Sequence, residues 1–129
     1  MKNKAQTIVR ILLGALFVFG GVAFFFTTPP PLTGDMALFF QGLQASKYFF
    51  LLLKITEILC GLALLTGFYV PLALVVLAPI VVNILMVHIF LDTNGLPVAL
   101  AVLVAFQYLA FLSPSYSPVL KKLLVSKPD

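Results

Sequence analysis

Four apolar runs, each long enough to cross a lipid bilayer, restrict this 129-residue chain to a small set of folds. They cover residues 7–26, 48–68, 71–91 and 96–112. A membrane-spanning helix needs about 20 predominantly apolar residues, with about 17 as the lower limit. Because a membrane has no water to bond free backbone groups, only helices and closed barrels can span it. Runs of this length predict an all-α membrane protein, folded as a four-helix transmembrane bundle.

The composition agrees with this class and argues against a soluble or nucleic-acid-binding protein. Hydrophobic residues make up 62% of the chain, charged residues 9%, and the mean hydropathy is +1.16, whereas soluble domains are about 45–50% apolar and about 25% charged. The net charge of +4 does not form one basic patch. The basic residues gather near the two ends of the chain, as Lys2, Lys4, Arg10, Lys121, Lys122 and Lys127. This distribution predicts a multi-pass membrane protein with both termini in the cytoplasm.

The start of the chain resembles a signal peptide, with a basic segment followed by an apolar one. The apolar run 7–26 is longer than the hydrophobic region of a usual signal peptide, and it ends in three phenylalanines in place of small residues. We therefore expect an uncleaved membrane helix. Arg10 lies less than one turn inside it and can extend its charged group to the headgroups.

The connections between the runs carry clear helix-breaking signals. Residues 27–35 include three consecutive prolines, which end the first helix. Residues 35–46 follow an amphipathic pattern, with Asp35 as the expected N-cap. The apolar positions of this short interfacial helix are Met36, Phe39, Phe40 and Leu43. Residues 119–129 form a basic, amphipathic tail, and the whole chain is expected to be a single membrane domain.

Lys54 and Glu57 lie inside the second apolar run, three residues apart. A charge near the centre of a membrane helix costs at least about 2.5–3.5 kcal/mol on insertion scales, so such charges are rare unless they are paired or functional. The spacing places both on one helix face together with Gly61. Two interpretations stay open: an ion pair that only fixes helix register, and a functional pair that relays protons or recognises a polar headgroup.

Further polar residues fall at a similar depth in the neighbouring helices. At 1.5 Å per residue, Glu57 lies roughly 14 Å and Asn83 roughly 12 Å below the outer membrane surface, with Gln107 and Tyr108 at a comparable level. The sequence therefore predicts a polar intramembrane cluster. Asn83 and Gln107 are expected either to hydrogen-bond between helices or to contact a ligand.

His88 lies about one turn from the outer end of the third run and is added to this cluster. It is expected to be either a hydrogen-bonded interfacial residue or a ligand-binding one. Its i+4 neighbour is Asp92.

Small residues indicate where helices approach one another. Gly14, Gly20, Gly21 and Gly61 are the expected packing positions. The single cysteine, Cys60, excludes an intramolecular disulfide, and one histidine with one intramembrane glutamate falls short of the usual three or four zinc ligands. We expect no metal site. No complete catalytic constellation is visible, which favours a protein that is not an enzyme.

An ordered series of segments resembles the DoxX family of small bacterial membrane proteins. The series is RILLGALFVFGG at residues 10–21, three prolines, SKYF at 46–49, EILCGLALLTGFYVPLAL at 57–74 and LAPIVVNILMVHIFLDTNGL at 77–96. DoxX sequences often carry a lysine shortly after the glycines of the first helix. Here the matching stretch, residues 21–26, has none, so no role of that lysine carries over.

The resemblance implies a four-helix membrane bundle and a link to redox chemistry. The family takes its name from a subunit associated with quinol and thiosulfate oxidation, and relatives are linked to redox or thiol-stress complexes. The leading hypothesis is a non-catalytic accessory subunit of such a complex in the bacterial inner membrane; no cofactor is predicted, and quinone stays open as a ligand. The alternatives are an assembly factor for client membrane proteins and a small transporter, and the oligomeric state, including a homo-oligomer, stays open.

Overall fold

The computed structural model describes residues 4–26 and 32–125, and within them every regular element is helical. Its elements are α1 (Lys4–Phe26), α2 (Gly34–Ala45), α3 (Phe49–Thr66), α4 (Val70–Phe90), the short 3-10 helix η1 (Thr93–Gly95), α5 (Leu96–Gln107), the π-helix η2 (Tyr108–Leu112) and α6 (Ser117–Lys122). Four segments are long and apolar enough to cross a membrane: α1, α3, α4 and the continuous segment from η1 to η2. The predicted fold class is confirmed. The three prolines and the last four residues of the basic tail lie outside the described residues.

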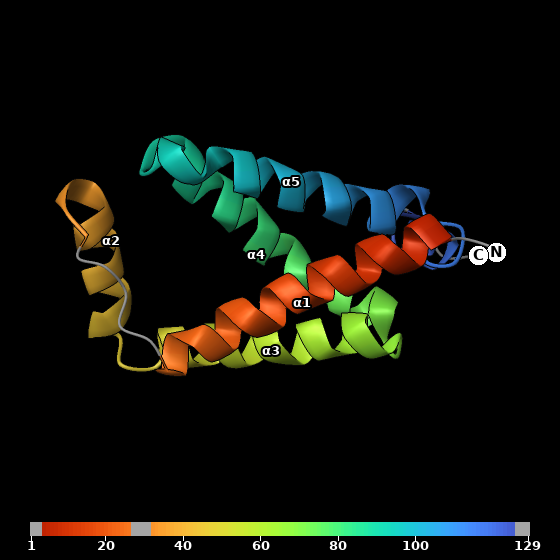
Figure 1. Cartoon of the computed structure of the whole chain (residues 1–129), viewed down its shortest axis with the longest axis horizontal. Coiled ribbons are helices and arrows are strands. Elements are labelled where there is room, and N and C mark those ends of the chain that lie inside the picture. The colour runs from red at the N-terminus through yellow and green to blue at the C-terminus, as the bar shows by residue number, and fades with distance from the viewer. Residues whose placement is uncertain (1–3, 27–31, 126–129) are drawn as a thin grey trace.

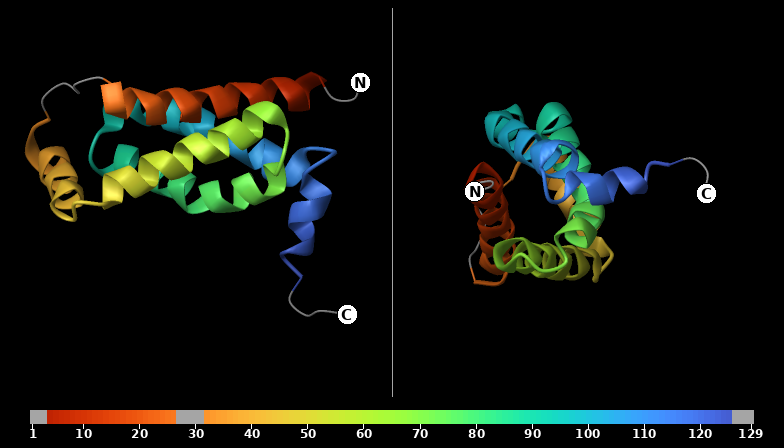
Figure 2. Two further views of the ribbon diagram at one scale, coloured as in Figure 1. Left: turned by 90° about the horizontal axis from the view of Figure 1, so that it is seen from below. Right: turned by 90° about the vertical axis from the view of Figure 1, so that its right-hand side faces the viewer.

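The four spans alternate in direction and form a ring in which each packs against two others. Helix α1 contacts α3 and α5, and α4 contacts the same two, while the diagonal pairs do not touch within the described residues. Figure 2 shows this ring in end view. At one end, called here the terminal end, lie the start of α1 and the short helix α6; α2 lies at the opposite end, called the α2 end (Figure 1). The α1–α3 pair and the α4–α5 pair diverge toward the α2 end.

The closest helix contact joins α1 to α3, where two glycines face each other. A Cβ atom at Gly14 would lie 2.8 Å from the Gly61 carbonyl oxygen, and one at Gly61 would lie 2.8 Å from the Gly14 carbonyl oxygen. Gly21 makes a third close approach, because a Cβ atom there would lie 3.1 Å from the Lys54 carbonyl oxygen. Small residues are what lets two membrane helices approach this closely. The packing role expected for Gly20 is wrong, since nothing lies within 4 Å of its Cβ position and it is exposed.

Helix α2 lies on the bundle through one apolar face. Met36, Phe39, Phe40 and Leu43 are half-buried, as the amphipathic pattern predicts, although no residue of α2 is fully buried. The expectation for Asp35 is wrong: the helix begins at Gly34, so the carboxylate lies in its first turn, and Thr33 occupies the N-cap position. An acid there is still favourable because it faces the positive end of the helix dipole.

The connection between α3 and α4 is tight because two of its three residues adopt left-handed backbone conformations. Gly67 ends α3 with φ +85°, where glycine carries no steric penalty, and Tyr69 precedes α4 with φ +59°. Pro71 lies in the first turn of α4, where a backbone N–H has no partner within the helix, so the N–H that proline lacks costs nothing. Consequently α3 and α4 are antiparallel neighbours.

The α1–α3 contact generates the first prediction. Gly14→Ala and Gly61→Ala each place a methyl group against the partner's backbone, which cannot move aside as a flexible side chain can. Overpacking of this kind costs about 1–3 kcal/mol, so both variants should unfold at a lower temperature in detergent. Gly20→Ala is the matched control and should unfold at the same temperature as the unchanged protein. Equal midpoints for all three variants would show that the glycine contact is not needed.

Candidate functional site

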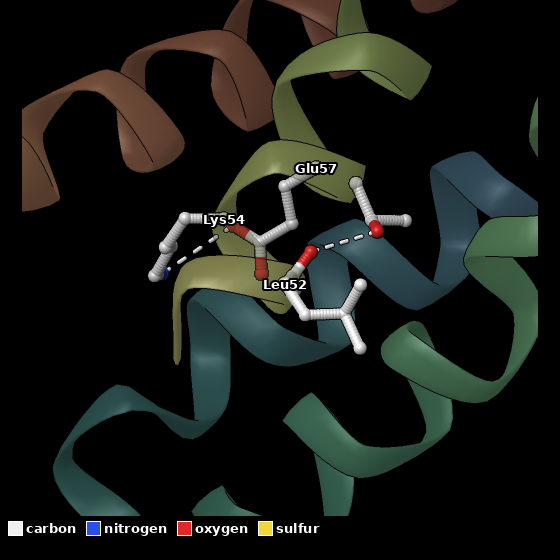
Figure 3. A network of polar contacts seen from close by, with 4 residues as sticks. Leu52, Lys54 and Glu57 are labelled. Carbon is white, nitrogen blue, oxygen red and sulfur yellow. Dashed lines mark hydrogen bonds and ion pairs between the residues drawn. The ribbon is translucent and has the colours of Figure 1, made fainter. Parts of the chain in front are cut away.

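The Lys54–Glu57 pair is the one ion pair that the described residues form. The Lys54 Nζ lies 3.4 Å from Glu57 Oε1, and Figure 3 shows the two side chains extending from neighbouring turns of α3 toward each other. Glu57 lies eight residues after the start of α3, which places it about 12 Å along the helix. The two opposite charges therefore meet inside the membrane-spanning segment.

Glu57 points into the bundle, whereas Lys54 keeps more contact with the surroundings. The buried residues of α3 are Glu57, Cys60, Gly61 and Leu64, which share the i, i+3, i+4, i+7 spacing of one helix face. The Glu57 side chain is 9% exposed and the Lys54 side chain 20%. Glu57 Oε2 accepts no hydrogen bond from a described residue, yet it is not sealed from the surroundings. One carboxylate oxygen is thus free to accept a hydrogen bond from a ligand.

Aromatic side chains from three helices gather beside Lys54 at the α2 end. Phe24 of α1 stacks on Phe50 of α3, with ring centroids 5.5 Å apart, and Phe40 of α2 contacts Phe50 at the same distance. The Lys54 Nζ lies 5.9 Å from the centroid of the Phe24 ring, within the range of a cation–π contact. We call Phe24, Phe40 and Phe50 the aromatic cluster. It joins α2 to the ion pair, and the sequence analysis did not anticipate it.

Asn83 and Gln107 are not brought to the ion pair. Both are exposed on the surface of their helices, and neither side chain makes a hydrogen bond with the described part of the chain. The expectation that they turn inward beside Glu57 is wrong, although their positions along the helices match the expected depth. Thr56, which is half-buried, shows the contrast, because its hydroxyl donates to the Leu52 carbonyl, 2.8 Å away. The two amides are polar groups in membrane-spanning segments without a hydrogen-bond partner among the described residues.

His88 and Tyr108 also lie apart from the pair. The His88 Nδ1 is 2.8 Å from the Ile84 carbonyl oxygen of its own helix, and the ring packs on Gly95. Tyr108 is half-buried against the core where the α-helix α5 passes into the π-helix η2. Within the described residues, no three His, Cys, Asp or Glu side chains come close enough to hold a metal ion. The predicted polar cluster thus consists, in the structure, of Lys54 and Glu57 alone.

Arg10 has a role that the sequence analysis did not find. Its Nη1 donates to the carbonyl oxygens of Leu64 at 2.6 Å and Leu65 at 3.2 Å, which belong to the last turn of α3. A cation there satisfies carbonyls that have no partner in the helix and complements the negative end of its dipole. Two signals could have suggested it: an arginine inside an apolar run, and the helix-ending Gly67 at the matching level of an antiparallel neighbour.

A second unforeseen contact joins the two ends of the described chain. The buried Gln6 side chain donates to the Ser115 hydroxyl and accepts from the Ser115 backbone N–H, both at 3.0 Å. The adjacent Ser113 hydroxyl donates to the Leu109 carbonyl and accepts from the N–H groups of Tyr116 and Ser117. These bonds hold the segment after η2 against the start of α1.

Comparison with known proteins supports the family assignment. The sequence model of the DoxX family matches residues 5–89, which is about two thirds of the chain and includes α1, α2, α3 and nearly all of α4. The chain belongs to the DoxX family. No curated protein and no solved structure matches this DoxX chain. The matched part contains the ion pair, the aromatic cluster, Arg10 and Asn83, whereas Gln107, Tyr108 and the terminal serines follow it.

The unequal burial of the pair in this DoxX protein predicts unequal effects of removing each partner. Lys54→Leu leaves the Glu57 charge buried without a partner, a change that typically costs about 3–5 kcal/mol. After Glu57→Leu, the longer and more exposed Lys54 can extend toward the α2 end, so the loss should be smaller. The double variant should recover most of the stability, since apolar residues often replace a buried ion pair without loss.

The measurement is the midpoint of thermal unfolding in detergent, together with the yield of monodisperse protein. Lys47→Leu, which removes a lysine outside the spans, is the control for the loss of one positive charge. Equal losses for Lys54→Leu and Glu57→Leu would contradict the unequal burial on which this prediction rests.

Proposed function

We propose that this DoxX protein is a non-catalytic accessory subunit of a membrane redox complex and that its Lys54–Glu57 pair binds a quinone headgroup. The observation that carries the proposal is a carboxylate 9% exposed inside a membrane-spanning bundle, with one oxygen paired to Lys54 and the other free. An ionisable residue inside a membrane-spanning segment is by default a candidate for a ligand site or a proton pathway.

The residues around the pair fit a quinone in three respects. The Glu57 carboxylate can accept a hydrogen bond from a quinol hydroxyl, and the Lys54 ammonium can donate one to a quinone carbonyl. The rings of the aromatic cluster, adjacent to Lys54, offer apolar faces against which a flat headgroup can stack. A few placed polar groups in a mostly apolar site are typical of cofactor binding. A bound quinone supplies the electron-transfer chemistry, and these residues hold and orient its headgroup.

The exposed amides support the accessory role. Asn83 and Gln107 lie in membrane-spanning segments without a hydrogen-bond partner in the described part of the chain. Polar side chains in a membrane hydrogen-bond across helices, with a gain of about 0.6–2 kcal/mol. We infer that a helix of another subunit supplies their partners. The same observation favours the second candidate, an assembly factor that binds client membrane proteins.

The proposal includes the location and orientation of the protein. The charges at the two ends of the bundle support it, because Lys4, Lys121 and Lys122 lie at the terminal end, while the α2 end carries Asp35, Asp92 and one described lysine, Lys47. By the positive-inside rule, the terminal end lies on the cytoplasmic side of the bacterial inner membrane.

The test for the ligand is co-purification in mild detergent, with extracted quinone quantified per protein by mass spectrometry. We expect quinone with the unchanged protein and a loss of at least tenfold with Glu57→Gln, which keeps the shape of the side chain and removes the carboxylate. Asp35→Asn, at the surface, is the matched control and should retain quinone. Unchanged protein without quinone, or Glu57→Gln with an equal amount, would contradict the proposal. The Lys54→Leu/Glu57→Leu double variant separates ligand loss from unfolding, because it should fold and still lack quinone.

The test for the partner is photo-crosslinking from inside the membrane. A crosslinking amino acid at position 83 or 107 should capture one recurring redox subunit, while the same group at Phe19, a 75% exposed position on α1, should not. Capture of many unrelated membrane proteins would favour the assembly factor. Recovery of this chain alone would contradict both hypotheses and indicate a homo-oligomer.

A further inference from the structure

An apolar cavity lies at the terminal end, on the side of the bundle away from the ion pair's helix. It has a volume of about 260 Å³ and lies between α4, the α5–η2 segment and α6. Its lining is apolar throughout. Ala78 and Phe106 contribute from the bundle, and Leu120, Leu123 and Leu124 close it from the side of α6. A cavity of this chemistry accepts hydrocarbon and offers nothing to a polar ligand.

Helix α6 has the orientation and pattern of a helix that lies in a membrane surface. Figure 2 shows that it leaves the end of the bundle and runs across the bundle axis. Leu120 of α6 and the turn residues Leu123 and Leu124 directly after it follow the i, i+3, i+4 spacing and are among the residues that line the cavity. Lys121 and Lys122, which lie between these leucines in the sequence, are exposed. Exposed lysines beside an apolar surface are typical of interfacial segments that bind anionic membranes.

Leu123 and Leu124 leave apolar surface uncovered beside the cavity. They are 65% and 68% exposed, although both also line the cavity. Acyl chains that enter the cavity would cover them. The hydrophobic effect therefore favours lipid at this position over an empty groove.

The positive charge beside the cavity favours a lipid with an anionic headgroup. Lys121 and Lys122 directly follow the cavity-lining Leu120, and Lys4 lies at the same end of the bundle, whereas Asp35, Asp92 and Lys47 lie at the α2 end. Lysines next to a membrane surface attract anionic phospholipids and gain nothing comparable from zwitterionic ones.

We propose that the α4–η2–α6 cavity is a binding site for an anionic glycerophospholipid of the leaflet next to the termini. One acyl chain occupies the cavity beneath Leu120, Leu123 and Leu124, and the phosphate lies against Lys121 and Lys122. The site is independent of the quinone proposal, since it lies at the opposite end of the bundle and shares no residue with the ion pair.

The experiment compares two lipids that differ only in their headgroups. The full chain in mild detergent is mixed with dioleoyl phosphatidylglycerol or dioleoyl phosphatidylcholine, and the lipid retained is measured by native mass spectrometry. We expect preferential retention of phosphatidylglycerol, reduced about tenfold in the Lys121→Gln/Lys122→Gln variant. Lys47→Gln, at the α2 end, is the control and should keep the preference.

A second pair of variants tests the cavity. Ala78→Phe fills it and should release both lipids, while Ala101→Phe places the same ring in the groove on the other face of α5 and should release neither. Both variants are compared only after size-exclusion chromatography and thermal unfolding show a folded protein; Ala110→Leu, which also reduces the cavity, replaces Ala78→Phe if that variant does not fold. Equal retention of the two lipids by the unchanged protein would overturn the proposal. So would retention that is insensitive to the lysines or to filling the cavity.

Discussion

The rest of the structure depends on the close contact between α1 and α3. In lipid there is no hydrophobic force between helices, so they associate through packing and interhelical hydrogen bonds. Gly14 and Gly61 allow the two backbones to touch, and this proximity has consequences along the whole pair. At the terminal end, it brings the Arg10 guanidinium to the last carbonyls of α3. At the α2 end, it places Gly21 on the Lys54 backbone and Phe24 on Phe50. The ion pair is therefore held by a rigid two-helix unit.

The two halves of the bundle differ in whether their polar side chains have hydrogen-bond partners. On the α1–α3 side, the polar side chains find partners: Lys54 pairs with Glu57, and Arg10 binds backbone carbonyls. On the α4–α5 side, His88 bonds the Ile84 carbonyl, but Asn83 and Gln107 are exposed and make no hydrogen bond with the described part of the chain. A free amide in hydrocarbon is costly because it loses its hydrogen bonds to water. This asymmetry is the physical reason to expect that the α4–α5 side meets another protein, whereas the α1–α3 side carries the ligand site. A bundle that binds both a ligand and a neighbouring subunit fits an accessory role in a larger complex.

Part of the candidate site could be predicted from the sequence, and the reason lies in the distances involved. Lys54 and Glu57 are three residues apart on one helix, so helix geometry alone places them within reach of each other. The apolar face of α2 follows in the same way from the spacing of Met36, Phe39, Phe40 and Leu43. Asn83 and Gln107 lie on other helices. Their depth follows from counting residues, but their direction depends on how each helix is rotated about its axis. In helices that are apolar on every side, the sequence carries almost no signal of that rotation.

By itself, the sequence determined the number of spans, their order, their approximate lengths and the position of the short helix between the first two. Those features follow from local physics: the thickness of the bilayer sets the length of each apolar run, and proline and glycine end the helices. The tertiary structure decided which glycines pack, that Arg10 caps α3, that Gln6 binds Ser115, and that three phenylalanines meet beside Lys54. Each of these contacts joins residues far apart in the chain, so it exists only once the helices have docked at one particular rotation and depth.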